Sequence, residues 1–316
     1  MNTQEMTNKH GLASHDLPTV DVKPRALLRN ILWSTDFSAA SNSSLPFAAA
    51  LARRFGSRLY AAHVISPHTL SFGPGMALLR LGMAEQMATR KISTTLDSHQ
   101  LGDIPHENIV GLGKTSRVLA NMAEDFDIEL LVLGSHGRKG LVGKILGSVA
   151  QETIHLSPCP VLTVGPRTSS AGPYEVGLKH ILCATDFSLE SVSAVQLALQ
   201  WAKSFSAHLT VLHVVEGSVA DAPDERGRLA TFFKKRLRRL VPRDAEELPG
   251  FELRIEFGSA PEWILKAAQQ PGTDLLVVGT RRAELLARRP SRGMIAQILS
   301  DVACPVLTVN QAALKA

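Results

Sequence analysis

A glycine-rich run at residues 134–148 is the part of the sequence best suited to bind a ligand. It holds five glycines in fifteen positions and directly follows a strongly apolar segment, residues 130–133. Glycine permits positive φ and lets backbone N–H groups approach a ligand closely, and successive amides in such a loop form a nest that binds anions. Arg138, Lys139 and Lys144 add positive charge within the run. The run therefore predicts a polyphosphate site, with a plain strand-to-helix turn as the alternative.

A helix that begins near Gly147 and Ser148 would strengthen such a site. Its first N–H groups have no partner within the helix, and its dipole places about half a positive charge at that end. Both features favour a bound phosphate.

The chain carries two copies of one unit. Residues 30–38 recur at residues 180–188, a shift of 150, and both segments contain Thr-Asp-Phe-Ser. After a variable stretch the shift becomes 145, and the sequence Cys-Pro-Val-Leu-Thr-Val of residues 159–164 returns at residues 304–309. Self-similarity of this length predicts a tandem repeat of one domain.

Length and composition agree with two domains. The chain has 316 residues, about twice the typical domain length, and 45% of them are hydrophobic. We expect one domain at residues 26–166, a linker rich in Gly, Pro and Ser at residues 167–177, and a second domain at residues 178–310. Residues 1–25 are polar and lack the apolar segment of a secretory signal, which predicts a disordered tail.

Charge and cysteine content limit the class of protein. No window reaches the roughly 18 consecutive apolar residues of a membrane span, so we expect no membrane partner. The three cysteines are far apart and show no pairing pattern, which argues against a disulfide framework or a zinc site. A reducing, cytoplasmic location fits this pattern. The net charge of +5 is compatible with an anion ligand without specifying it.

Within each copy, apolar segments of strand type alternate with helical patterns. The near-continuous apolar run at residues 130–133 indicates a strand buried on both faces. Strands that alternate with helices then predict an α/β fold with a parallel sheet and helices on each side. The first helix should follow Asp36 and Ser38, which are both favourable N-cap types, and it should continue through residues 45–55.

These motifs together resemble the ATP-binding universal stress proteins, the UspA-like family. Gly134, two residues, Gly137, nine residues and then Gly147-Ser148 match the G-2x-G-9x-G-[ST] pattern of that family. The resemblance covers nearly the whole chain and implies two tandem Rossmann-like domains of the adenine nucleotide alpha hydrolase type. Each would be a five-stranded parallel sheet of order 3-2-1-4-5, with the ligand where strands 1 and 4 meet.

The resemblance also implies roles for single residues. Thr35 and Asp36 would meet the adenosine end of ATP, and the backbone around Val64 would line the adenine pocket. The ribose and phosphates would be held by Gly134, Gly137, Gly147 and Ser148, with Arg138 nearby. Asp36 is also a candidate ligand for an accompanying Mg²⁺, and a helix N-cap is the alternative interpretation of this residue. His63 is expected to be a packed strand residue.

The second copy differs at the loop. An ungapped alignment places Arg282 opposite Gly137, Arg292 opposite Gly147 and Gly293 opposite Ser148. A non-glycine residue at positive φ costs about 1–2 kcal/mol, and its side chain would occupy phosphate space. We therefore expect one ATP per chain, bound by the first copy.

The family resemblance implies an internal partner as well. The final strands, residues 161–164 and 306–309, would pair antiparallel about a pseudo-twofold axis. Each strand otherwise leaves an open edge, which proteins tend to cover or pair. The chain would then contain its own dimer interface, and a further homodimer would use other surfaces.

Two further patterns are better explained by the fold than by ligand binding. The basic run at residues 234–239 is interpreted as the solvated face of a helix, and nucleic acid is the less favoured alternative because no aromatic residues are interleaved with the charges. An apolar stripe at helical spacing is interpreted as core packing, and it comprises Met76, Leu79, Met83 and Met87.

These observations favour an ATP-binding stress or regulatory protein of the cytosol, in which nucleotide occupancy changes conformation or partner choice. A slow ATPase or phosphotransferase in the same pocket is one alternative, and a nucleotide-free interaction scaffold is another. Phosphoryl transfer needs a positioned nucleophile, metal ligands and charge stabilisation. No second acidic group in a motif context accompanies Asp36, so the sequence favours binding over catalysis.

Overall fold

The computed structural model describes seven segments of the chain: residues 28–67, 77–135, 147–168, 177–217, 223–270, 272–280 and 294–310. The expected N-terminal tail, most of the expected linker and the centre of the glycine-rich loop lie outside these described residues.

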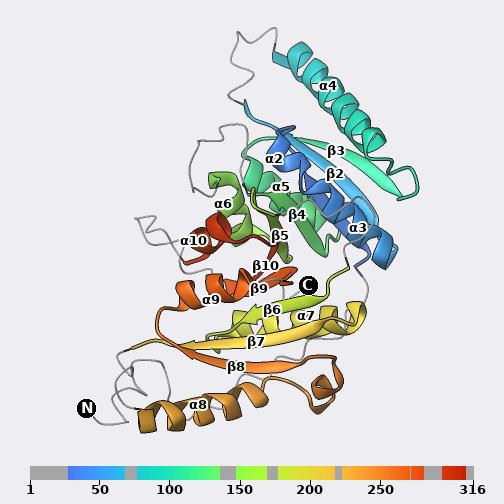
Figure 1. Cartoon of the computed structure of the whole chain (residues 1–316). Helices are drawn as coiled ribbons and strands as arrows, with labels where there is room; N and C mark the ends of the chain where they lie inside the picture. Colours follow the sequence, from blue (N-terminus) through green and yellow to red (C-terminus); the bar gives the residue numbers. More distant parts are fainter. Residues whose placement is uncertain are drawn as a thin grey trace.

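Within the described segments, ten strands form one sheet in the order β3-β2-β1-β4-β5-β10-β9-β6-β7-β8 (Figure 1). The first copy contributes β1 (Asn30–Ser34), β2 (Arg58–Ile65), β3 (His106–Leu112), β4 (Leu130–Gly134) and β5 (Val161–Val164). The second copy contributes β6 (His180–Ala184), β7 (His208–Val215), β8 (Glu252–Phe257), β9 (Leu275–Thr280) and β10 (Val306–Asn310). Neighbouring strands within each copy are parallel. The order 3-2-1-4-5 is thus confirmed in both copies.

The two copies meet at β5 and β10, which pair antiparallel. Leu162 lies opposite Leu307 in this register. The Thr308 hydroxyl donates to the Val161 carbonyl at 3.1 Å, and the Asn310 amide donates to the Ser157 carbonyl at 2.8 Å. The antiparallel pairing expected for the final strands is therefore present, and it makes one continuous sheet out of two.

Helices cover both faces of this sheet (Figure 1). The first copy forms α2 (Ala39–Asn42), α3 (Leu45–Phe55), α4 (Ala77–Ser98), α5 (Thr115–Asp125) and α6 (Ser148–Leu156). The second copy forms α7 (Leu189–Phe205), α8 (Pro223–Arg238), the 3₁₀ helix η2 (Arg243–Glu247), α9 (Ala260–Ala268) and α10 (Met294–Asp301). Helices α3, α4, α7 and α8 pack on one face, and α5, α6, α9 and α10 pack on the other.

Each face has a buried core that runs across both copies. Successive strand residues point to opposite faces, so Ile31 and Trp33 belong to one core and Leu32 to the other. On the first of these faces Phe55 of α3 lies against Phe205 of α7, with ring centroids 5.7 Å apart. The copies are therefore joined by apolar packing as well as by strand pairing.

The first helix differs between the copies. The second copy has one helix of 17 residues, α7. In the first copy the same stretch is divided into α2 and α3, with Pro46 in the first turn of α3. Proline lacks the N–H needed for a helix interior, and its ring clashes with the carbonyl four residues earlier. The second copy has Gln196 at the equivalent position, which allows the helix to continue.

The apolar stripe on α4 is exposed where it is described. Leu79, Met83 and Met87 are large hydrophobic residues left open to solvent, so the interpretation of these three as core packing was wrong. The helix instead buries Ala88 and Ile92. Helical spacing identifies a stripe without showing how far along the helix the sheet extends.

Substitution of a residue in the β5–β10 pairing, which is the joint between the two copies, tests whether the copies unfold together. Leu307→Ala removes a fully buried side chain opposite Leu162 and should destabilise the protein by about 2–5 kcal/mol. Because both cores continue across the joint, urea denaturation followed by circular dichroism should show one transition at lower urea. Leu112→Ala, at a side chain that is 45% exposed, is the control and should shift the midpoint little. Two separate transitions in the unmodified protein would contradict a single cooperative unit.

Candidate functional site

The ligand-binding crevice is predicted at the ends of β1 and β4, and the structure confirms that these two strands run side by side. Trp33 is in register with Val132, so the two strands end at the same edge of the sheet. The chain beyond β1 leads into α2, and the chain beyond β4 leads into the glycine-rich loop. The next helices, α3 and α6, belong to opposite faces. This divergence of the chain at neighbouring strand ends is the geometry at which open α/β sheets bind ligands.

A network of side chains shapes the turn after β1. The Asp36 carboxylate accepts a hydrogen bond from the Ser38 backbone N–H at 3.0 Å. The Ser38 hydroxyl in turn accepts from the Ser41 N–H at 3.1 Å and is the N-cap of α2. The interpretation of Asp36 as the N-cap itself was therefore wrong, because that role belongs to Ser38. Asp36 stabilises the turn that presents the cap.

The second copy repeats the same turn. Asp186 accepts from the Ser188 N–H at 2.9 Å, and Ser188 is the N-cap of α7. Since this arrangement persists in the copy with the altered loop, the aspartate is explained by the fold in both copies.

Thr35 is almost completely buried, and its hydroxyl is used within the turn. It accepts from the Phe37 N–H at 2.9 Å and donates to the Asn42 side-chain oxygen at 3.0 Å. The backbone N–H of Thr35 donates to Ala62 at 2.9 Å. The described contacts of Thr35 thus fix the shape of the crevice wall.

Phe37 is a residue that the sequence analysis passed over. Its φ is 65°, in the left-handed region, where a bulky side chain costs on the order of 1–2 kcal/mol. Its ring packs on the His63 ring with centroids 4.4 Å apart. The His63 Nδ1 lies 2.8 Å from the Thr35 carbonyl, so that nitrogen carries the proton and donates. The expectation that His63 is a packed strand residue is confirmed.

The strained phenylalanine also occurs in the second copy. Phe187 has φ 65° and packs on His213 with centroids 4.5 Å apart. The recurrence of Thr-Asp-Phe-Ser was the signal that could have identified this residue. Non-glycine residues held in a strained conformation are common at functional sites, so Phe37 is a candidate site residue.

Gly134 is required by packing. A Cβ at this position would lie 2.8 Å from the Ala40 carbonyl carbon and closer still to its oxygen. Gly279, the equivalent residue, has the same constraint, since its Cβ would lie 2.6 Å from the Glu190 carbonyl carbon. In both copies the helix after the first strand approaches the end of the fourth strand so closely that only glycine fits. This requirement is independent of any ligand.

The two ends of the glycine-rich loop are held together. The Gly147 N–H donates to the Ser135 carbonyl at 2.8 Å, and the Ser135 N–H donates to the Val164 carbonyl at 2.9 Å. Gly137 and Arg138 lie outside the described residues. The loop therefore leaves and re-enters the structure beside the end of β4.

Helix α6 begins at the re-entry point, as the sequence predicts. Gly147 is its N-cap and offers no side chain to satisfy the first-turn N–H groups. Ser148 is exposed, and Val149 is 46% exposed. The positive end of the helix dipole is thus open to solvent beside the end of β4, which favours a bound anion.

Val64 completes the set of predicted residues. It lies near the end of β2, in register with Gly111 of β3, and its side chain is buried. Because β2 is parallel to β1, Val64 lies at the same edge of the sheet as Thr35. The structure therefore brings the described predicted residues to one edge.

The described residues give little support to a metal site, a membrane-spanning helix or a cysteine nucleophile. They contain no group of three or more His, Cys, Asp or Glu side chains able to hold a metal ion. They also contain no helix long and apolar enough to cross a membrane. The three cysteines are buried, and burial raises the pKa of Cys159 to about 11 and that of Cys304 to about 12. Burial also raises the pKa of Cys183, so none of these thiols is poised as a nucleophile.

The packing of Gly134 leads to a testable prediction. Gly134→Ala should destabilise the protein by about 1–3 kcal/mol, because α2 would have to move to accommodate the methyl group. Thermal denaturation measures the change. Gly102→Ala is the matched control, since a Cβ there would meet no atom within 4 Å. Equal stability of the two variants would show that the close approach of α2 and β4 is wrong.

Comparison with known proteins gives one consistent result. A model described as "Universal stress protein family" matches residues 28–165 and 177–310. Universal stress protein A homolog 1 of Coxiella burnetii is 31% identical over 140 residues, which is 43% of this chain and 95% of that protein. The tandem chain is therefore about two such units long.

Solved structures agree on the fold. A universal stress protein from Archaeoglobus fulgidus superposes with a TM-score of 0.65 over 89% of this chain and 98% of that chain, at 17% identity. A universal stress protein in complex with cAMP has a TM-score of 0.33 at 22% identity and covers 44% of this chain and 98% of that chain. That second likeness is too slight to carry an argument about ligands.

Proposed function

Because universal stress protein domains account for residues 28–165 and 177–310, the chain belongs to the universal stress protein family, and we propose that its first domain binds ATP between β1 and β4. One observation carries the proposal. A glycine-rich loop leaves β4 and returns at Gly147, where the exposed N-terminus of α6 begins. The first-turn N–H groups of α6 and its helix dipole are thereby open at this point, which suits a phosphate, and the glycines of the loop would add further backbone amides.

The two ends of the nucleotide would meet different parts of the crevice. The phosphates would lie at Gly147 and Ser148, and Gly137 and Arg138 of the loop would contribute to the same part of the site. The adenosine would lie toward β2, beside Asp36 and the backbone of Val64. The close packing of Gly134 against α2 fixes the end of β4 from which the loop departs.

Mg²⁺ would enter with the phosphates. This ion keeps several water ligands and needs only one or two protein carboxylates beside phosphate oxygens. Asp36 offers one carboxylate at the crevice, and it already accepts a hydrogen bond from Ser38. The protein would therefore contribute little to holding the ion, and the nucleotide would supply most of the charge.

The proposed role is regulatory binding in the cytoplasm. The turn that contains Asp36 and Phe37 is held by hydrogen bonds and by a ring contact with His63. Nucleotide that contacts this turn would shift the conformation of the turn and of the strained Phe37 within it. A shift of this kind is how occupancy could alter the surface offered to a partner.

We also infer that the β5–β10 pairing acts as an internal dimer interface. It joins equivalent strands of the two domains in antiparallel fashion. Both strands are thereby removed from solvent as edges. Any further homodimer would use another surface.

Blocking the loop tests the ATP site. The unmodified chain should bind ATP in the micromolar range, about −8 kcal/mol, and Gly137→Arg should abolish binding by filling the loop. Isothermal titration calorimetry measures both proteins. Gly102→Arg adds the same side chain at an open position and should bind ATP normally. Unchanged binding by Gly137→Arg would remove the basis for the site.

Stoichiometry tests the difference between the domains. Native mass spectrometry should find one ATP per chain, because arginines stand where the second loop would need glycines at the positions of Gly137 and Gly147. The Gly137→Arg protein should carry none. Two equivalent ATP molecules per chain, or full retention in the variant, would show that the second domain binds ATP in the same way.

A further inference from the structure

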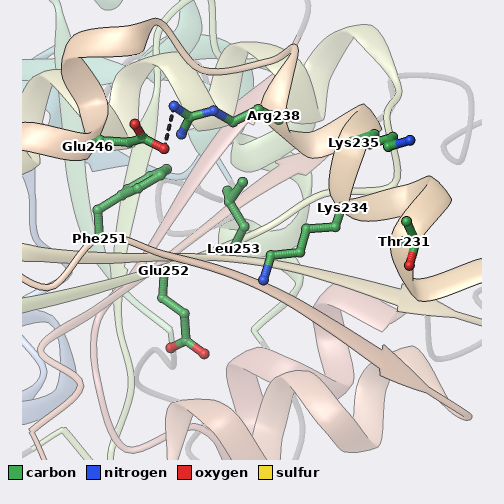
Figure 2. A pocket seen from close by; sticks show the side chains of 8 residues that line it. All are labelled: Thr231, Lys234, Lys235, Arg238, Glu246, Phe251, Glu252 and Leu253. Atoms are coloured by element: carbon green, nitrogen blue, oxygen red, sulfur yellow. Dashed lines mark ion pairs between the residues drawn. The ribbon is translucent and has the colours of Figure 1, made fainter. Parts of the chain in front are cut away.

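A groove with a basic wall lies in the second domain, far along the sheet from the β1–β4 crevice. It has a volume of about 590 Å³ and lies between α8 and β8 (Figure 2). Its lining residues are Thr231, Lys234, Lys235, Arg238, Glu246, Phe251, Glu252 and Leu253. This groove has no part in the proposed ATP site.

The cations of the groove are positioned by apolar packing of α8. Phe233 and Leu237 are buried and hold the helix against the sheet, which turns Lys234 and Lys235 outward. Figure 2 shows the Lys234 side chain extending from α8 across the groove toward β8. Arg238 forms an ion pair with Glu246 at one end. The solvated helix face expected from the sequence is therefore also one wall of a groove.

Strand β8 supplies the other wall, and it is the last strand in the sheet order. The Gly258 N–H donates to the Val215 carbonyl of β7 at 3.0 Å. The backbone groups of Gly258 and of every second residue before it therefore point toward β7. Backbone groups of alternate residues in a parallel strand point to opposite sides, so those of Leu253 and Ile255 point to the outer edge. The Trp263 indole donates to the outward carbonyl of Phe257 at 2.9 Å, which agrees with this direction.

The outer strand of the first domain, β3, lacks the apolar residues that β8 contributes to this groove. At the shift of 145, His106 stands in place of Phe251, and Asn108 stands in place of Leu253. The Asn108 amide donates to the Ser93 hydroxyl at 2.9 Å. A polar contact with α4 thus takes the place of the apolar surface that Phe251 and Leu253 form in the second domain. The groove is thus a feature of the domain whose nucleotide loop is altered.

We propose that this groove binds an extended acidic segment of a partner protein, which adds to β8 as a further strand. The outward N–H and C=O groups of Leu253 and Ile255 would pair with the backbone of the segment. Every second side chain of the segment would lie on the α8 side, where Lys234 and Lys235 favour carboxylates. The methylene groups of these same side chains would contact Phe251 and Leu253, which lie on the α8 side of β8.

A single-stranded nucleic acid fits the groove less well. Such ligands are held by cations together with aromatic side chains on which the bases stack. Phe251 is the aromatic residue among those that line the groove, and it is only partly exposed. The outward backbone groups of β8 satisfy a peptide backbone and offer nothing specific to a nucleic acid.

The test uses the full chain and a labelled seven-residue peptide in which aspartate alternates with valine. Fluorescence anisotropy should show saturable binding that weakens with salt. Lys234→Glu should weaken it about tenfold or more, because one wall reverses its charge. Arg239→Glu is the matched control, since it reverses an exposed charge of the same run outside the groove lining, and it should change affinity less than about twofold.

Two N-methylated peptides distinguish strand addition from general charge attraction. Each is methylated at alternate amides, so that one version blocks the edge facing β8 and the other blocks the edge facing solvent. Strand addition requires that one version lose binding while the other retains it. Equal binding by both versions, no binding of the parent peptide, or tighter binding of an oligothymidylate that Lys234→Glu also weakens would each overturn the proposal.

Discussion

The antiparallel hydrogen bonds between β5 and β10 are the contact on which the rest of the structure depends. Each domain by itself would end in a short strand, β5 or β10, whose side chains are buried but whose backbone edge has no neighbouring strand. Such an open edge promotes aggregation. Pairing these edges turns two five-stranded sheets into one and leaves β3 and β8 as the outer strands. Both apolar cores then extend across the joint, so packing on either face supports the same connection.

With the joint fixed, the two domains can differ at their ligand edges without losing the fold. Both keep the aspartate turn, the serine cap, the left-handed phenylalanine on a histidine, and a glycine against the first helix. These shared features are explained by folding. The glycine spacing after β4 is kept only in the first domain. The difference between the copies therefore separates what the fold requires from what a ligand requires.

The two outer strands, β8 and β3, also differ between the domains. Strand β8 is accompanied by a basic helix and an apolar floor, whereas β3 has His106 and Asn108 at the matching positions. The proposed ATP site thus belongs to one domain, and the basic groove belongs to the other, at the far end of the same sheet. One continuous sheet with a buried core on each face lies between them.

The sequence by itself determined the repeat, the α/β class and the start of α6 near Ser148. These follow from local patterns: apolar strands, helical spacing, and glycines whose spacing matches a known loop. The strand order was implied by the resemblance to the universal stress proteins, because no local pattern shows which strands lie side by side. Only the tertiary structure decided that Ser38 is the cap beside Asp36, that Gly134 is demanded by Ala40, and that Leu79, Met83 and Met87 are exposed. It also decided that Lys234, Lys235 and Arg238 of the basic run line a groove beside β8. Each of these depends on which segment lies across from the residue in space, and neither spacing nor composition along the chain carries that information.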